Sequence, residues 1–345
     1  MKNTTQTSRR GFLTAGFGGL VAATMSGAIP VRAETWGLGD PCLPKEGSYI
    51  DGKKVRWIDG SEKYKVLDES NTYNLLVEPI KRKGSHGFEI RTNEVVLDLG
   101  SYKIVGDEES IMGYFSGVIV SGDNNEIKNG EISRFYMGAN VSGDNSKLNR
   151  ITVNYNEFGI GLEGGSKHTL NKITAAWNNC DGIHLEPSSE SIISDFLVRD
   201  NFLGINIYGN KNLLTRGEIS GNQKPFSSNS ITNVIKDVKF DKDIAPEFYE
   251  DKDSITRQTT YQPTILGSDG QPTNEALVTL VRQDGQIALA LPTGFDGKIN
   301  PTPVTTYILQ EGLKSDRAPF TVLVDGKIRG SWDGSNGLEQ VIQLQ

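Results

Sequence analysis

Short alternations of apolar and polar residues recur along the middle of the chain at a nearly constant spacing. Five segments start at a glycine and continue with apolar residues at every second position: GVIVSG, GANVSG, GIGLEG, GIHLEP and GINIYG, from Gly117, Gly138, Gly159, Gly182 and Gly204. Successive glycines are 21, 21, 23 and 22 residues apart. Such a period is typical of a solenoid in which each repeat is one structural unit.

A second apolar alternation follows in the later half of each repeat, in EIKNGEI, KLNRITV, TLNKITA, IISDFLV and LLTRGEI. Each repeat therefore predicts two strands joined by turns. No repeat could bury its apolar face alone, but stacked repeats would form a continuous core. One predicted inward column holds Val118, Ala139, Ile160, Ile183 and Ile205, and the next holds Val120, Val141, Leu162, Leu185 and Ile207. Asparagines at Asn156, Asn179 and Asn201 predict a ladder of side-chain hydrogen bonds at one turn.

Together with the lead-in from His86 to Gly106, these repeats resemble the right-handed parallel β-helix of the pectin-lyase-like superfamily. The resemblance covers residues 86–240 and implies an all-β fold. That superfamily contains polysaccharide lyases, galacturonan hydrolases, epimerases, phage tail proteins and non-catalytic members. No motif here matches the catalytic signature of one of these families residue by residue, so the resemblance indicates the fold and leaves the activity open.

The flanking sequence lacks the repeat. Residues 34–85 are expected to form an N-terminal cap or incomplete first rungs, and the charged stretch 241–262 is expected to be a linker or excursion. In residues 263–345, two alternating runs surround an Asp-Gly pair, in ALVTLVRQDGQIALALP and FTVLVDGKIRGSW. Asp-Gly between alternating runs predicts β-hairpins, and hence a small antiparallel C-terminal module.

The N-terminus resembles a bacterial twin-arginine export signal: SRRGFL precedes a weakly apolar run and Val31-Arg32-Ala33. We expect residues 1–33 to be removed and the protein to be periplasmic or extracellular. The segment holds four Lys or Arg and no acid, so its loss changes the net charge from −7 to −11. That charge argues against nucleic acid or an anionic membrane as partner. No other stretch is apolar enough for a membrane span.

Chemistry is expected in two outward columns: Ile119, Asn140, Gly161, His184 and Asn206 in one, and Ser121, Ser142, Glu163, Glu186 and Tyr208 in the other. Outward positions of a β-helix are ordinarily solvated surface, but a histidine beside stacked carboxylates is suited to work on a glycan. The predicted catalytic residues are His184, Glu186, Glu163 and Asp181. The predicted substrate-binding residues are Tyr208, Trp177, Arg199, Asn206 and Asn140.

These groups fit more than one reaction. Glu163 and Glu186 could act as the acid and base of a glycoside hydrolase. In a lyase or epimerase, His184 could instead take the proton beside a uronate carboxylate, which Arg199 could neutralise. Tyr208 and Trp177 could stack on sugar rings, and the oxygens of Glu163, Glu186 and Asp181 would suit a calcium ion. No zinc-type Cys/His spacing or other metal motif is present.

The expected function is that of an exported carbohydrate-active enzyme, a polysaccharide lyase, hydrolase or epimerase, that binds its glycan along the β-helix. The alternative is a non-catalytic glycan-binding or exopolysaccharide-assembly protein with the same face. Two cysteines, Cys42 and Cys180, are too few for a disulfide scaffold but leave one bridge open.

Overall fold

The computed structural model describes residues 46–59, 65–241, 247–248, 253–310, 313–335 and 337–345. The predicted export signal, residues 1–33, and Cys42 lie outside the described residues. The described part is built from strands and one short helix, α1 (Glu108–Met112). It contains no helix that is long and apolar enough to cross a membrane.

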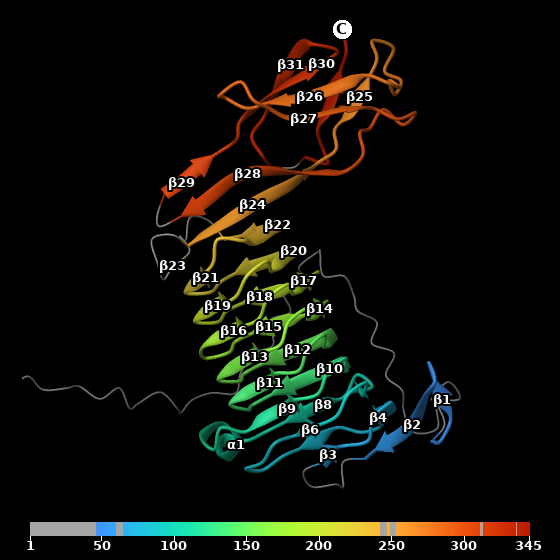
Figure 1. Cartoon of the computed structure of the whole chain (residues 1–345), viewed down its shortest axis with the longest axis vertical. Helices are drawn as coiled ribbons and strands as arrows, with labels where there is room; N and C mark the ends of the chain where they lie inside the picture. Colours follow the sequence, from blue (N-terminus) through green and yellow to red (C-terminus); the bar gives the residue numbers. More distant parts are fainter. Residues whose placement is uncertain (1–45, 60–64, 242–246, 249–252, 311–312, 336) are drawn as a thin grey trace, which may run out of the picture. The chain divides into compact units, whose positions relative to one another are not determined.

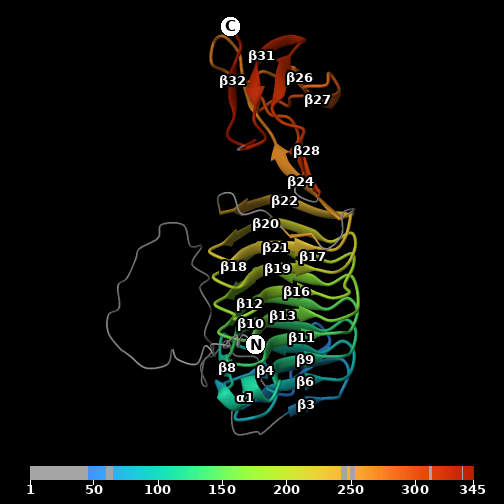
Figure 2. The ribbon, with the colours of Figure 1, turned by 90° about the vertical axis from the view of Figure 1, so that its left-hand side faces the viewer.

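Residues 54–258 form a parallel β-helix of about nine turns, which confirms the predicted fold class. One side is a nine-stranded parallel sheet that takes one strand from each turn (Figure 1). In order, its strands are β3 (Lys65–Leu67), β6 (Phe88–Ile90), β9 (Ser116–Val120), β11 (Met137–Val141), β13 (Phe158–Leu162), β16 (Asp181–Leu185), β19 (Leu203–Ile207), β21 (Lys224–Ser228) and β23 (Glu247–Phe248). Figure 2 shows these strands stacked one above another.

The second alternation of each repeat forms a bent strand or a pair of strands. The long forms are β10 (Glu126–Ser133), β12 (Lys147–Asn154), β20 (Leu213–Ser220) and β22 (Asn233–Phe240); the split forms are β14 (Thr169–Asn171) with β15 (Thr174–Ala176), and β17 (Ile192–Ser194) with β18 (Leu197–Arg199). A residue in the left-handed region marks each bend, among them Asn129, Arg150, Lys172, Asp195, Arg216 and Asp237. Each rung therefore has three straight segments where the alternation alone predicted two.

Both predicted inward columns are confirmed. The strand registers align Val118, Ala139, Ile160, Ile183 and Ile205, and likewise Val120, Val141, Leu162, Leu185 and Ile207. All ten side chains are fully buried in one continuous core.

The repeated glycines allow neighbouring rungs to approach closely. A Cβ on Gly159 would lie 2.2 Å from the carbonyl oxygen of Gly182, and one on Gly182 would lie 2.8 Å from that of Gly204. The same relation holds at Gly117, Gly138 and Gly204. Because backbone carbonyls cannot yield as a flexible side chain can, the second position of each of these strands requires glycine.

The asparagine ladder exists, but one of its predicted members was wrong. Its buried members are Asn156, Asn178, Asn201 and Asn222, each linked to the next by a side-chain amide hydrogen bond of 3.0–3.2 Å. Asn179 is exposed and donates to Glu157 instead. The 23-residue interval places one extra residue between the ladder and Gly182, so counting back three residues selected the neighbour of the true member.

A second buried ladder was not predicted. The backbone N–H of Ser146 donates to Nδ1 of His168, and the N–H of His168 donates to Ser191. Asn212 and Asn233 continue the series on the following rungs. His168 thus satisfies a turn backbone, and its burial lowers the pKa of its imidazole.

The β-helix extends beyond the expected range of 86–240 at both ends. Near its start, β1 (Tyr49–Ile50) forms a hairpin with β2 (Lys53–Ile58), and β2 pairs in parallel with β4 (Thr72–Leu76). The strands β5 (Ile80–Lys81), β7 (Val96–Asp98) and β8 (Lys103–Val105) continue the stack. At the other end, β24 (Ser254–Tyr261) lies within the expected linker and pairs in parallel with β22.

The C-terminal module has its own apolar core and an antiparallel sheet in the order β27-β26-β30-β31. Its strands are β25 (Thr264–Leu266), β26 (Leu277–Val281), β27 (Ile287–Pro292), β30 (Phe320–Val324), β31 (Lys327–Trp332) and β32 (Val341–Gln343). Between β27 and β30 in the chain, β28 (Thr302–Gln310) pairs with β24, and β29 (Leu313–Asp316) pairs with β28. Both predicted hairpins are confirmed, as β26–β27 and β30–β31.

Candidate functional site on the nine-stranded sheet

His184 lies between two carboxylates on its own strand. Its Nδ1 is 2.7 Å from Oδ2 of Asp181, and its Nε2 is 2.7 Å from Oε2 of Glu186. The three predicted catalytic residues of strand β16 and its end are therefore in direct contact. The strand register also confirms the predicted outward column, since His184 lies beside Gly161 on one side and Asn206 on the other.

The carboxylate of Asp181 is buried and holds the ring in place. Besides His184, its Oδ2 accepts a hydrogen bond of 3.0 Å from the side-chain amide of Asn206. Asn206 in turn accepts a hydrogen bond of 2.6 Å from the hydroxyl of Ser227. Asn206 and Ser227 are both buried. Asn206, predicted to bind substrate, is thus placed to position Asp181.

The two contacts favour the protonated form of His184. Ionised carboxylates only accept and a neutral imidazole has a single N–H, so the imidazolium can donate to Asp181 and Glu186 at the same time. Burial alone would lower the pKa of His184, but the bonds to Asp181 and Glu186 outweigh it and raise that pKa above its usual value. The Glu186 side chain is 56% exposed, against 17% for His184, so the carboxylate is the group that faces solvent.

Aromatic rings flank the histidine along the helix axis. Tyr208 is stacked on the imidazole at 6.2 Å between ring centroids, and Phe158 meets it edge-on at 6.4 Å. Phe158 contacts Tyr136, which contacts Tyr114 on the side away from His184. This aromatic column, Tyr114, Tyr136, Phe158 and Tyr208, thus continues on both sides of His184.

Tyr114, Tyr136 and Phe158 were missed by the sequence analysis. Phe158 and Asp181 occupy the position before the repeated glycine, which was interpreted as a turn. In the structure both begin a strand, and both contact His184 on the outer face. Strict alternation from Ile160 and Ile183 would place Phe158 and Asp181 on the inward side, so the pattern could not indicate that they lie on the outer face.

Glu163 lies on the rung before Glu186, in the same column. Its carboxylate accepts a hydrogen bond of 2.7 Å from the side-chain amide of Asn140, one rung further back. Glu163 therefore turns away from Glu186, which bonds to His184. Asn140 belongs to the outward column of His184, so its bond to Glu163 crosses from one predicted column to the other.

Trp177 and Arg199 form a separate group at the end of the other sheet. The Trp177 indole stacks on Tyr155 of the preceding rung at 5.4 Å, and the Arg199 guanidinium lies 4.1 Å from its ring centroid. Arg199 also forms an ion pair of 2.7 Å with Asp200. Trp177 remains 40% exposed beside these two partners. The expected stacking of Trp177 on a sugar and the expected neutralisation of a uronate by Arg199 stay predictions.

The described residues contain no group of three or more His, Cys, Asp or Glu arranged to hold a metal ion, so the suggested calcium site finds no support. Cys180 has no disulfide partner there. Its thiol donates to Glu157 at 3.3 Å, and burial together with this bond raises its pKa to about 12.

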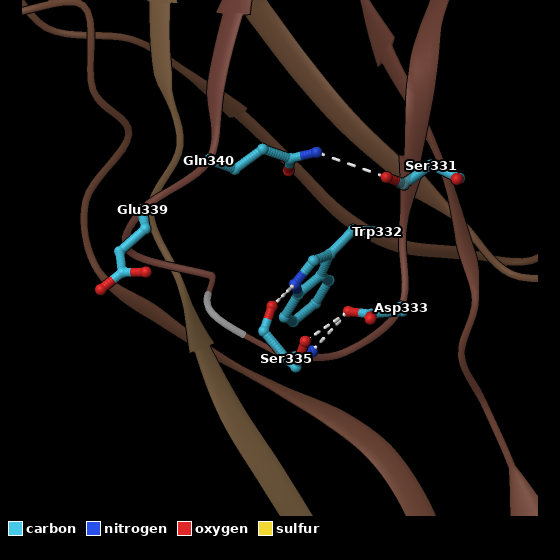
Figure 3. A pocket seen from close by; sticks show the side chains of 6 residues that line it. All are labelled: Ser331, Trp332, Asp333, Ser335, Glu339 and Gln340. Atoms are coloured by element: carbon cyan, nitrogen blue, oxygen red, sulfur yellow. Dashed lines mark hydrogen bonds between the residues drawn. The ribbon is translucent and has the colours of Figure 1, made fainter.

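A cavity of about 480 Å³ lies in the C-terminal module, lined by Ser331, Trp332, Asp333, Ser335, Glu339 and Gln340 (Figure 3). Its polar groups largely bond to one another: Ser335 donates to Asp333, Gln340 donates to Ser331, and the Trp332 indole donates to Ser335. Trp332 packs on Tyr261 and Phe320 and is almost fully buried. These contacts indicate a structural role for the indole.

Comparison with models of protein families and with curated proteins gives no match. Among solved structures, the chain is similar to ORF18 of Geobacillus virus E2, with 10% sequence identity over 77% of this chain and 70% of that chain and a TM-score of 0.36. At these values the similarity gives no indication of function.

Proposed function

We propose that the protein is an exported glycoside hydrolase that binds a polysaccharide on the outer face of the nine-stranded sheet. The observation that carries the proposal is the placement of His184 between buried Asp181 and exposed Glu186, each at 2.7 Å. Export rests on the resemblance of residues 1–33 to a twin-arginine signal. Membership of the pectin-lyase-like superfamily is part of the proposal, supported by stacked rungs of 21–23 residues.

Each group has a defined role in this reaction. Asp181, fixed by Asn206, orients the imidazole and stabilises its charged form. The Nε2–H of His184 supplies a proton to Glu186, which transfers it to the glycosidic oxygen as that bond breaks. A water molecule attacks the anomeric carbon, Glu163 on the neighbouring rung takes one proton of that water, and the remaining hydroxyl forms the bond that replaces the broken glycosidic bond. Glu163 and Glu186 lie on adjacent rungs, whose backbones are about 4.8 Å apart, and their carboxylates bond to different partners, Asn140 and His184.

Elimination or epimerisation is less well supported by the same contacts. Both reactions need a free base and a cation that neutralises a uronate carboxylate. Both nitrogens of His184 are engaged, and the guanidinium of Arg199 is paired with Asp200 at the other sheet. These two engagements favour hydrolysis over the lyase and epimerase alternatives.

A second candidate is a glycan-binding protein without activity. It is favoured by the aromatic column, because Tyr114 and Tyr136 extend it beyond the titratable residues. Rings along one face could hold a sugar chain with no reaction.

The two candidates differ in turnover. The protein is incubated with a panel of polysaccharides while new reducing ends and the ultraviolet absorbance of unsaturated uronates are both followed. Hydrolysis produces reducing ends without the absorbance, whereas a lyase produces both.

Glu186→Gln and His184→Ala should each reduce the rate by at least about a hundredfold. Glu190→Gln, at an exposed carboxylate paired with Lys211, is the matched control. Unchanged activity in both site variants would refute the site, and binding without turnover on the whole panel would favour the second candidate.

A further inference from the structure

The outer face around His184 is acidic as well as aromatic. The four outward-facing stretches 136–142, 157–163, 180–186 and 202–208 contain four carboxylates, Glu157, Glu163, Asp181 and Glu186, and no lysine or arginine. With His184 protonated, these four stretches carry a net charge of −3. The next cation along the sheet is Lys224, which lies over the Phe202 ring at 5.4 Å.

We infer that the glycan bound here carries protonated amino groups, as a de-N-acetylated hexosamine polymer does. The inference rests on the proposed function and adds the substrate class. A polyuronate would bring its carboxylates against Glu163 and Glu186, where the only cation of the four stretches, the His184 imidazolium, already contacts Asp181 and Glu186. An ammonium group, in contrast, is attracted to each carboxylate and can lie over an aromatic ring.

The arrangement of the carboxylates suits a polymer that carries one positive charge on each sugar unit. Glu163 and Glu186 occupy one column on adjacent rungs, so their backbone positions are about 4.8 Å apart, a spacing of the same order as one sugar unit of an extended chain. Each carboxylate uses one oxygen for a partner within the protein, Asn140 for Glu163 and His184 for Glu186. Tyr208 and Phe158 lie beside this row and can contact the apolar faces of the sugars.

The test compares three oligosaccharides of equal length by calorimetry: N-acetylglucosamine oligomers, their fully de-N-acetylated counterparts and oligogalacturonates. We expect the amino oligomers to bind most tightly and their affinity to fall as salt is added. Glu163→Gln, which can still accept from Asn140, should weaken amino-oligomer binding about two- to fivefold and leave the N-acetylated oligomer unchanged. Glu190→Gln should change the affinity for neither the amino oligomer nor the N-acetylated oligomer.

The outcomes separate the substrate class from the activity. Equal or tighter binding of the N-acetylated or galacturonate oligomer overturns the inferred substrate class, even if that oligomer is hydrolysed. Tight, salt-sensitive binding of the amino oligomer without turnover supports the substrate class and contradicts the hydrolase. Absence of binding by all three overturns the inferred substrate class, while the hydrolase is still decided by turnover on the polysaccharide panel.

Discussion

The carboxylate of Asp181 lies 2.7 Å from Nδ1 of His184, three residues further along the same strand. This contact links the position of Asp181, which the strand backbone sets, to the protonation of His184 on the outer face. Because Glu186 approaches the other nitrogen, the ring is held as a cation at a partly buried position.

The three histidines should titrate in two classes. The pKa of His184 is expected above the ordinary value of about 6.5, and those of His86 and His168 below it, because burial disfavours their charged forms. Nuclear magnetic resonance of the imidazole nitrogens measures all three together. Asp181→Asn should lower the pKa of His184 and leave the other two unchanged. Three similar titration curves would contradict the geometry of the cluster.

Stability should depend on pH through the same contacts. The pKa of His184 is raised in the folded state, so its contribution to the free energy of unfolding is complete below about pH 6.5 and is lost as the pH rises through the folded-state pKa. Urea denaturation at about pH 5.5 and about pH 8.5 should therefore show a decrease in the wild type that is smaller in His184→Gln. An equal decrease in both proteins would assign the effect to other groups.

Replacement of one asparagine and its neighbour should give opposite results. Asn178→Ala removes a buried amide that bonds to both adjacent rungs, and it should lower the free energy of unfolding by about 1–3 kcal/mol. Asn179→Ala alters an exposed side chain and should change it by less than about 0.5 kcal/mol. Chemical denaturation measures the free energy of unfolding of both variants. A larger loss for Asn179→Ala than for Asn178→Ala would contradict the assignment of Asn178 to the ladder.

The glycine column should not accept even one methyl group. Gly159→Ala would place a Cβ 2.2 Å from the carbonyl oxygen of Gly182, so we expect a loss of at least about 1–3 kcal/mol from strained packing. Gly294→Ala is the control, since its nearest atoms would lie at 3.4 and 3.7 Å. Equal melting temperatures for the two variants would show that the rungs adjust freely.

Cys180 should be unreactive in the folded protein. With its pKa near 12, very little thiolate exists at about pH 8, so labelling should be at least about a hundredfold slower than after unfolding. The experiment uses Cys42→Ser so that only one thiol reports. Glu157→Gln should accelerate labelling by removing the charged acceptor, and fast labelling of the parent would contradict this environment.

The sequence was sufficient for the inward columns and for the outer face that His184 shares with Glu186, but it did not predict the hydrogen bond between these two side chains. Alternation with a period of two assigns Ile183 and Leu185 to the core and His184 and Glu186 to the outer face. It could not show that Asp181 joins them, because the glycine that follows interrupts the alternation. It also could not show that Arg199 pairs with Asp200, since the directions of long side chains at a corner depend on neighbouring rungs.

Among the five repeats that start at Gly117, Gly138, Gly159, Gly182 and Gly204, the one that carries His184 follows the longest interval, 23 residues from Gly159 to Gly182. Its additional residue is accommodated at the corner, where Asn179 and Cys180 turn outward without displacing Asn178 or shifting the register of β16. The corner before β16 is therefore a point where chain length can vary while the stack stays in phase. It is the natural place to insert or graft a loop beside His184, with the strands on either side serving as fixed supports.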